Sequence, residues 1–289
     1  MATIDAKLVK QLREMTDSPM MECKKALEEA DGDLDKAVDV LRKMGVAKAV
    51  KKAGRDTNEG TIGIAVSDDG KAAAMVQVSC ETDFVGTNPK FTSFAEHLAE
   101  VILNTAPQDV DDLKTKAFSE GETVDEALTE LIHTMGENMK IARFAFEKTE
   151  SGAFARYVHG GKLGVLVEFR FAQDATAKNE AFNTFAHDVA MQVAATNPVA
   201  ANKEDVPQET IDHEKAIYMA QAKESGKPEA IQEKMAEGRL NKYYKENVLV
   251  EQEFIKDSSQ TINALMKRVA KDAGDDISIV RFERFAFGE

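Results

Sequence analysis

The chain has 289 residues, of which 43% are hydrophobic and 30% are charged, a composition typical of a soluble protein with a substantial core. Its 37 Lys and Arg against 51 Asp and Glu give a net charge of −14. Because contacts to phosphate depend on cationic side chains, this charge argues against direct nucleic-acid binding and against an anionic membrane surface. The length allows about two domains.

The sequence carries no sign of a membrane or secretory segment. No apolar run approaches the roughly 18 residues that span a bilayer, and charges are scattered through the first thirty residues, where a signal peptide would be apolar. The two cysteines, Cys23 and Cys80, are too few for a disulfide framework. We therefore expect a cytoplasmic protein in a reducing compartment, with no membrane partner.

Short motifs of the common enzyme classes are absent from the sequence. There is no G-x-x-x-x-G-K-[ST], G-x-G-x-x-G, H-E-x-x-H or C-x-x-C, and no G-x-S-x-G nucleophile elbow. The five histidines lack the spacing of metal ligands, and His159-Gly160-Gly161 favours a turn between two strands over an oxyanion hole. These absences favour a binding or regulatory protein that is not an enzyme and has neither a cofactor nor a metal site.

Residues 1 to about 45 predict three short helices. Ser18 and Pro19 are typical of a helix start, with a capping hydroxyl followed by proline at the first helical position. Gly45 is expected to end the third helix. Six cations and no acid occupy residues 42–55, where a solvated helix end and linker is favoured over nucleic-acid contact.

The remainder of the chain contains an internal duplication. Residues 72–78 align with residues 163–169 at an offset of 91, and residues 141–144 align with residues 279–282 at an offset of 138. Each copy predicts a strand, a turn, a second strand, a loop and a helix, and then a closing helix and a final strand. In the second strand of the first copy, apolar residues alternate with polar ones, so Cys80 is expected in the core.

The two offsets differ by 47 residues, which predicts an insertion in the second copy between about residues 200 and 246. Apolar residues at helical spacing lie there on a charged background, interrupted at Gly226-Lys227-Pro228. The pattern predicts an antiparallel two-helix hairpin. The hairpin is either a solvated protrusion or an arm that contacts a partner, and both interpretations stay open.

The loop between the second strand and the helix differs between the copies. Phe84, in Thr82-Asp83-Phe84-Val85, aligns with Ala175. An aromatic ring without a counterpart in the sister copy fits a wedge aimed at another molecule. The alternative, which composition favours, is that Phe84 caps its own core, because an exposed Phe forgoes roughly 1.5–3 kcal/mol of burial.

Four segments together resemble a known family. They are residues 8–13, residues 20–27, Thr82-Asp83-Phe84-Val85, and residues 157–167 with the sequence Tyr-Val-His-Gly-Gly-Lys-Leu-Gly-Val-Leu-Val. In this order and spacing, the sequence resembles the elongation factor Ts family, the guanine-nucleotide exchange factors of elongation factor Tu, over essentially its whole length.

The resemblance implies an α+β fold, and the duplication and insertion indicate the same plan. Residues 1–55 would form a ubiquitin-associated-like three-helix module and linker, and residues 56–150 the first subdomain of a duplicated core. Residues 151–199 and 247–289 would form the second subdomain. Residues 200–246 would form an inserted coiled-coil or dimerisation hairpin.

The resemblance also implies which residues meet the partner. In the family, the segment that is here Thr82, Asp83, Phe84 and Val85 is associated with dislodging Mg²⁺ from the nucleotide site of elongation factor Tu. The aromatic residue, here Phe84, inserts into the GTPase domain, and Asp83 works beside it.

Further contacts are implied outside that segment. Met20 and Met21 of the N-terminal module would contact the GTPase domain, and the region of His159 and Gly160 would face the partner's other domains. For both methionines, packing within the three-helix module is the alternative.

The function implied is binding to elongation factor Tu in its GDP form, displacement of Mg²⁺ and release of GDP so that GTP can bind. Such a factor must prefer the empty partner, since equal binding to both states would shift nothing. One alternative is a non-catalytic adaptor or chaperone-like module, and another is an enzyme with an unrecognised site around His159. Whether the chain forms a homodimer is left open.

Overall fold

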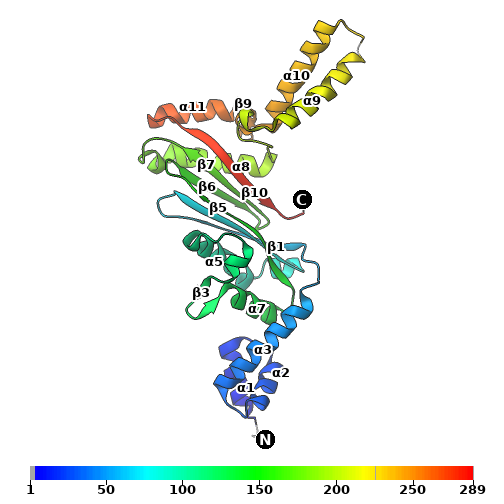
Figure 1. The fold of residues 1–289 in the computed structure, drawn as a ribbon. Helices are drawn as coiled ribbons and strands as arrows, with labels where there is room; N and C mark the ends of the chain where they lie inside the picture. Colours follow the sequence, from blue (N-terminus) through cyan, green and yellow to red (C-terminus); the bar gives the residue numbers. More distant parts are fainter. Residues whose placement is uncertain (1–3, 225, 289) are drawn as a thin grey trace. The chain divides into compact units, whose positions relative to one another are not determined.

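The structure, a computed structural model, describes residues 4–224 and 226–288 (Figure 1). It mixes helices and strands in an α+β fold with helices at the N-terminus, as predicted. The chain divides into two units, one formed by Met1–Gly63, Ala74–Ala145 and Phe287–Glu289, the other by Ile64–Ala73 and Phe146–Ala286. Each unit is described by itself.

The three predicted N-terminal helices are present as α1 (Ala6–Thr16), α2 (Met20–Glu29) and α3 (Leu34–Lys52). The side chains of Asp5 and Asp33 accept hydrogen bonds from the first turns of α1 and α3, as N-caps do. Their apolar stripes meet in a small core. The fully buried members of that core are Leu12, Cys23, Ala26, Leu27 and Ala37.

Two expectations for this region are wrong. Ser18 is not the N-cap of α2; that position belongs to Pro19, and the Ser18 hydroxyl is buried without a hydrogen-bond partner among the described residues. Gly45 does not end α3, which continues to Lys52 through much of the cationic stretch expected to be a linker. A Cβ atom placed on Gly45 would lie 3.5 Å from the Cβ of His133, so packing against another helix overrides its tendency to end a helix.

The first copy has the predicted order of elements. It comprises β1 (Glu59–Val66), β2 (Ala72–Cys80), α5 (Pro89–Thr105), α7 (Val124–Met135) and β5 (Met139–Lys148). The strands form a sheet in the order β1-β2-β5. Cys80 is fully buried, as expected. Its polar neighbour Ser79 is also buried, so burial does not alternate along this strand, and the Ser79 hydroxyl donates to Thr57 Oγ1 at 3.0 Å.

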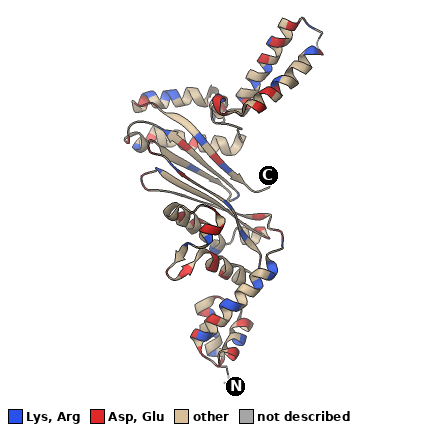
Figure 2. Ribbon diagram, in the orientation of Figure 1, with Lys and Arg blue, Asp and Glu red and all other residues tan. Residues whose placement is uncertain are grey.

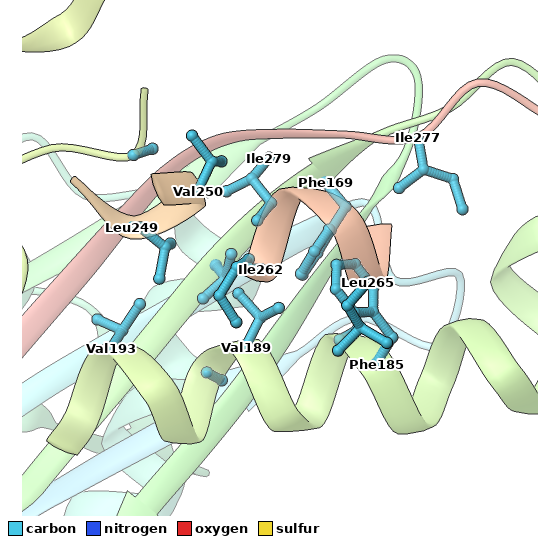
Figure 3. Packing of buried hydrophobic residues seen from close by; sticks show 14 of the residues in the cluster. Phe169, Phe185, Val189, Val193, Leu249, Val250, Ile262, Leu265, Ile277 and Ile279 are labelled. Carbon is cyan, nitrogen blue, oxygen red and sulfur yellow. The ribbon is translucent and has the colours of Figure 1, made fainter. Parts of the chain in front are cut away.

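The second copy repeats this arrangement with β6 (Ala153–His159), β7 (Leu163–Arg170), α8 (Glu180–Thr196), α11 (Ile262–Ala273) and β10 (Ser278–Ala286). The sheet order is β10-β7-β6, and β7 is antiparallel to both neighbours. The second strand is therefore central in both copies. Figure 3 shows Phe169 of β7 with Phe185 and Val189 of α8 and Ile262 of α11 in the core of this copy. The ring centroids of Phe169 and Phe185 are 5.8 Å apart.

Matching backbone conformations support the register of the duplication. Ala106 and Asn197, 91 residues apart, both adopt left-handed backbone after their helices, with φ of 46° and 44°. Gly136 and Gly274, 138 residues apart, end α7 and α11 in the same way, with φ of 80° and 68°.

The inserted segment forms α9 (Gln208–Lys223) and α10 (Glu229–Asn247), the two helices predicted there. Figure 2 shows charges of both signs along this hairpin. Its ends are joined at its base, where Val199 N donates to Asn247 O at 2.8 Å and Leu249 N donates to Ala200 O at 3.0 Å.

Shorter elements complete the fold. They are α4 (Asp83–Gly86), α6 (Val110–Lys114), β3 (Ala117–Ser119), β4 (Glu122–Thr123), η1 (Thr176–Lys178), η2 (Lys203–Asp205), η3 (Leu249–Glu251), β8 (Glu253–Phe254) and β9 (Asp257–Thr261). Among the described residues, no helix combines the length and apolar character that crossing a bilayer requires.

Candidate functional site

The loop after β2 presents one aromatic side chain to solvent. Phe84 lies in the four-residue helix α4 and is 84% exposed. The alternative that Phe84 caps its own core is therefore wrong. The apolar side chain that this segment contributes to the interior is the next one, Val85, which is 8% exposed.

Hydrogen bonds close the α4 turn at both ends. Thr82 is the N-cap, and its Oγ1 accepts from Val85 N at 3.5 Å. At the other end, Thr87 Oγ1 donates to Asp83 O at 2.9 Å, and Asn88 N donates to Val85 O at 2.9 Å. Asn88 then caps α5, so little unstructured chain remains on either side of Phe84.

The turn also packs closely on backbone. A Cβ atom on Gly86 would lie 3.2 Å from the carbonyl oxygen of Gly60 in β1. Gly60 itself has a φ of +153°, and a Cβ there would lie 2.1 Å from Val78 O. The two glycines therefore permit close backbone approaches, of the end of α4 to β1 and of β1 to β2.

Two acidic residues that the sequence analysis did not single out hold the segment before Phe84. Glu137, in the loop after α7, accepts from Thr82 N at 3.0 Å and from Thr82 Oγ1 at 2.7 Å. Glu81 accepts from Asn138 N at 2.5 Å and forms an ion pair with Arg55 at 3.3 Å. The signal in the sequence was the acid that follows a helix-ending glycine in both copies, at Glu137 and Asp275.

Met20 and Met21 begin α2 and are 53% and 64% exposed. Their packing within the three-helix module, the alternative considered for both, is therefore wrong. The interior of that module is filled instead from the next turn of α2, by Cys23, Ala26 and Leu27. Two adjacent flexible thioether side chains on a helix end form an adaptable apolar surface.

His159 is the last residue of β6, and Gly160 begins the predicted turn to β7. Lys162 N donates to His159 O at 3.1 Å, and Gly160 and Gly161 have φ of 57° and 73°. His159 is exposed, and its Nδ1 lies 3.1 Å from the hydroxyl of Tyr157. Within residues 4–224 and 226–288, no group of three His, Cys, Asp or Glu side chains is arranged to hold a metal ion.

Helix α2 is close to α3 and α7 through a partly buried cluster of polar side chains. Glu22, one residue after Met21, forms an ion pair with Lys48 of α3, and its Oε2 lies 3.3 Å from His133 Nε2 of α7. The His133 side chain is fully buried, and this burial lowers its pKa. Lys52 Nζ donates to Ile132 O at 3.3 Å, at the C-terminal end of α7. The cluster therefore connects the helix that carries both methionines with α7, within the unit that also carries Phe84.

A cavity of about 330 Å³ is lined by residues of α1, α3 and α7, among others. Glu130 of α7 lines it, and burial, together with repulsion from Glu122, raises the pKa of Glu130 to about 7 despite the opposing charge of Arg42. Glu130 Oε1 has no hydrogen-bond partner among the described residues. This carboxyl group therefore lies in a weakly solvated position where α3 packs against α7.

The geometry defines a duplicated α+β protein that presents a fixed, exposed aromatic turn from one copy only. The sequence matches the family described as Elongation factor TS over residues 81–289. It is 46% identical over 287 residues to "Elongation factor Ts" of Clostridium botulinum (strain Alaska E43 / Type E3), covering 99% of this chain and 93% of that protein. The proteins of the same name from Clostridium perfringens (strain SM101 / Type A) and Clostridium tetani (strain Massachusetts / E88) are each 45% identical, covering 99% of this chain and 93% and 94% of theirs. The chain belongs to the elongation factor Ts family.

Proposed function

We propose that this protein is a guanine-nucleotide exchange factor that binds elongation factor Tu in its GDP form, dislodges Mg²⁺ and promotes release of GDP so that GTP can bind. Family membership supports this function. The single structural observation that carries it is the 84% exposure of Phe84 on a turn closed by hydrogen bonds at both ends.

The proposed mechanism is differential binding. To move its partner from a 1:99 to a 99:1 ratio of empty to nucleotide-bound states, the factor must prefer the empty state by about 5.5 kcal/mol. Insertion of the Phe84 ring between elements of the GTPase domain would recover the roughly 1.5–3 kcal/mol of burial that the free protein forgoes. Since Mg²⁺ bridges phosphate oxygens in such sites, displacement of its ligands weakens the grip on GDP.

The other residues of the segment have separate roles in this proposal. Asp83, exposed beside Phe84, takes over hydrogen bonds in the opened site or repels the diphosphate. Thr82 caps the turn, and Val85 acts from inside the fold by anchoring it. Met20 and Met21 add apolar contacts to the GTPase domain, and the turn at His159 and Gly160 faces the partner's other domains.

In the same proposal the protein acts in the cytoplasm, is not an enzyme, uses no cofactor and contacts no nucleic acid. Its parts are an N-terminal module (residues 1–55), two core subdomains (56–150, and 151–199 with 247–289) and the hairpin (200–246). Whether the hairpin mediates a homodimer is a separate question, which the mass of the free protein in solution answers.

The test is the rate at which elongation factor Tu releases a fluorescent GDP. We expect Phe84→Ala to lower the accelerated rate at least tenfold, which raises the activation free energy of GDP release by about 1.4 kcal/mol or more, while thermal melting stays unchanged. Val199→Ala, which shortens another exposed apolar side chain (52% exposed), is the matched control. A wild-type chain that binds elongation factor Tu without accelerating release would instead identify an adaptor.

A further inference from the structure

We propose that Glu137 is the positioning residue for Phe84: its carboxylate holds Thr82 and thereby fixes the direction in which the ring projects. The proposal rests on the exchange function proposed above, and it assigns a role to a residue 53 positions away from Phe84 in the sequence. Glu137 does not touch the partner in this proposal; it acts through Thr82.

A series of hydrogen bonds connects Glu137 to the helical turn that carries Phe84. Both carboxylate oxygens of Glu137 are used on one residue, accepting from the backbone N–H and from the hydroxyl of Thr82 at 3.0 and 2.7 Å. The same hydroxyl oxygen accepts from Val85 N, which closes the first turn of α4. Because charge-assisted hydrogen bonds to a carboxylate are stronger than neutral ones, this arrangement fixes the N-cap from which Phe84 departs.

The second copy provides an internal comparison. Asp275 occupies the position equivalent to Glu137, directly after the glycine that ends the helix in a left-handed conformation. Asp275 accepts from Gln173 N at 2.8 Å, and Gln173 is the counterpart of Thr82. It also accepts from Ala172 N at 3.2 Å and from the hydroxyl of Thr176 at 2.7 Å. In both copies, therefore, the carboxylate after the helix-ending glycine (Glu137 or Asp275) accepts hydrogen bonds from the strand-to-helix loop. We call this arrangement the carboxylate clasp.

The copies differ in what the clasp presents. Phe84 in the first copy stands where Ala175 stands in the second, so only the first clasp orients a side chain capable of insertion. The first copy is also held by a second acid, since Glu81 accepts from Asn138 N and pairs with Arg55, whereas its counterpart Ala172 has no carboxylate. The clasp belongs to the shared fold, and the first copy combines it with a projecting ring.

A partner-free experiment measures the positioning directly. The chain contains no tryptophan, so Phe84→Trp introduces a single reporter at the ring position. In that background we expect Glu137→Ala to speed the local reorientation of the indole, seen as a lower residual anisotropy in time-resolved fluorescence. Glu137→Gln, which retains an acceptor for Thr82 N, should restore most of the anisotropy. Asp275→Ala, the same change in the other copy, should leave it unchanged.

Nucleotide exchange then tests the consequence, with the full-length chain carrying Phe84. At saturating factor, we expect Glu137→Ala to lower GDP release from elongation factor Tu about tenfold, Glu137→Gln to stay within about threefold of the wild type, and Asp275→Ala to stay within about twofold. Thermal melting of each variant identifies the loss due to destabilisation, and rates are compared at a temperature where all three are folded.

The outcomes separate the two proposals. If Phe84→Ala abolishes exchange while Glu137→Ala exchanges normally or leaves the anisotropy unchanged, the positioning role is wrong and the exchange function stands. If Asp275→Ala lowers exchange as much as Glu137→Ala, the effect is general destabilisation and the positioning role is also wrong. If the wild type fails to accelerate release at all, the proposed function fails, and the anisotropy series still decides whether Glu137 orients the ring position.

Discussion

Phe84 and Val85 are neighbours in one four-residue helix, yet Phe84 is 84% exposed and Val85 only 8%. The two side chains therefore have different roles. Val85 anchors the segment in the core, and Phe84 is left free to contact a second molecule. Substitutions at the two positions should therefore have opposite profiles.

Val85→Ala is expected to lower the free energy of unfolding by about 1–2 kcal/mol, because it removes buried methyl groups and leaves a small cavity. Phe84→Ala should change the free energy of unfolding by less than about 0.5 kcal/mol, since an exposed side chain contributes little to the folded state. Urea unfolding of the two variants measures both values. Equal destabilisation by the two substitutions would contradict the division of tasks.

The raised pKa of Glu130 predicts a stability change with pH. Its pKa is about 7 in the folded protein against an ordinary 4.5, so the folded state holds its proton more tightly. Stability is therefore lost as pH rises from about 4.5 through 7. Glu130→Gln should raise the free energy of unfolding at pH 8 by about 1–2 kcal/mol, allowing for partial solvent screening. At pH 4.5 the gain should vanish, and a gain independent of pH would contradict the assignment.

The lowered pKa of His133 predicts the opposite dependence of stability on pH. Burial lowers its pKa below the ordinary 6.5, so the unfolded chain takes up a proton that the folded chain resists. The contribution of His133 to stability is present above pH 6.5 and is lost as pH falls below it. His133→Gln should flatten the pH dependence of the unfolding free energy between about pH 6.5 and 5. A steeper fall in this variant would mean that protonated His133 is stabilised by Glu22 rather than destabilised by burial.

Gly238 offers a stabilising substitution. It lies inside α10, and a Cβ added there would meet nothing within 4 Å. Gly238→Ala should increase the stability of the hairpin by up to about 1 kcal/mol, since glycine is a poor helix former. Gly60→Ala is the contrasting change, because its Cβ would collide with Val78 O and its φ is positive. Hydrogen exchange of hairpin amides should slow for the first variant, and the second should unfold at markedly lower temperature.

Much of the fold could be predicted because local pattern and tertiary structure agree. The apolar stripe of α2 is a periodicity that can be read from a single segment, and the duplicated order of elements can be read from the alignment of the two copies. The helix α3 departs from its expected end because Gly45 meets His133, a contact between residues 88 positions apart that no local signal contains.

The candidate site was harder to predict from the sequence, for a related reason. Composition favoured burial of Phe84, since a single aromatic residue in a short loop is as compatible with a core as with a surface. Its exposure is decided by the placement of Val85, Gly86 and Gly60. The contact of Thr82 with Glu137 joins two loops, and only the alignment of the two copies could have indicated it.

The base of the α9–α10 hairpin has a consequence for how this fold can vary. Because the backbones at Val199 and Asn247 are hydrogen bonded to one another, the segment leaves and rejoins the domain at a single point. A segment of different length or sequence at this position would have to bring its two ends together at the same point. It would leave the order of the strands unchanged. Changes in the hairpin would therefore leave the duplicated core and the aromatic turn of the first copy in place.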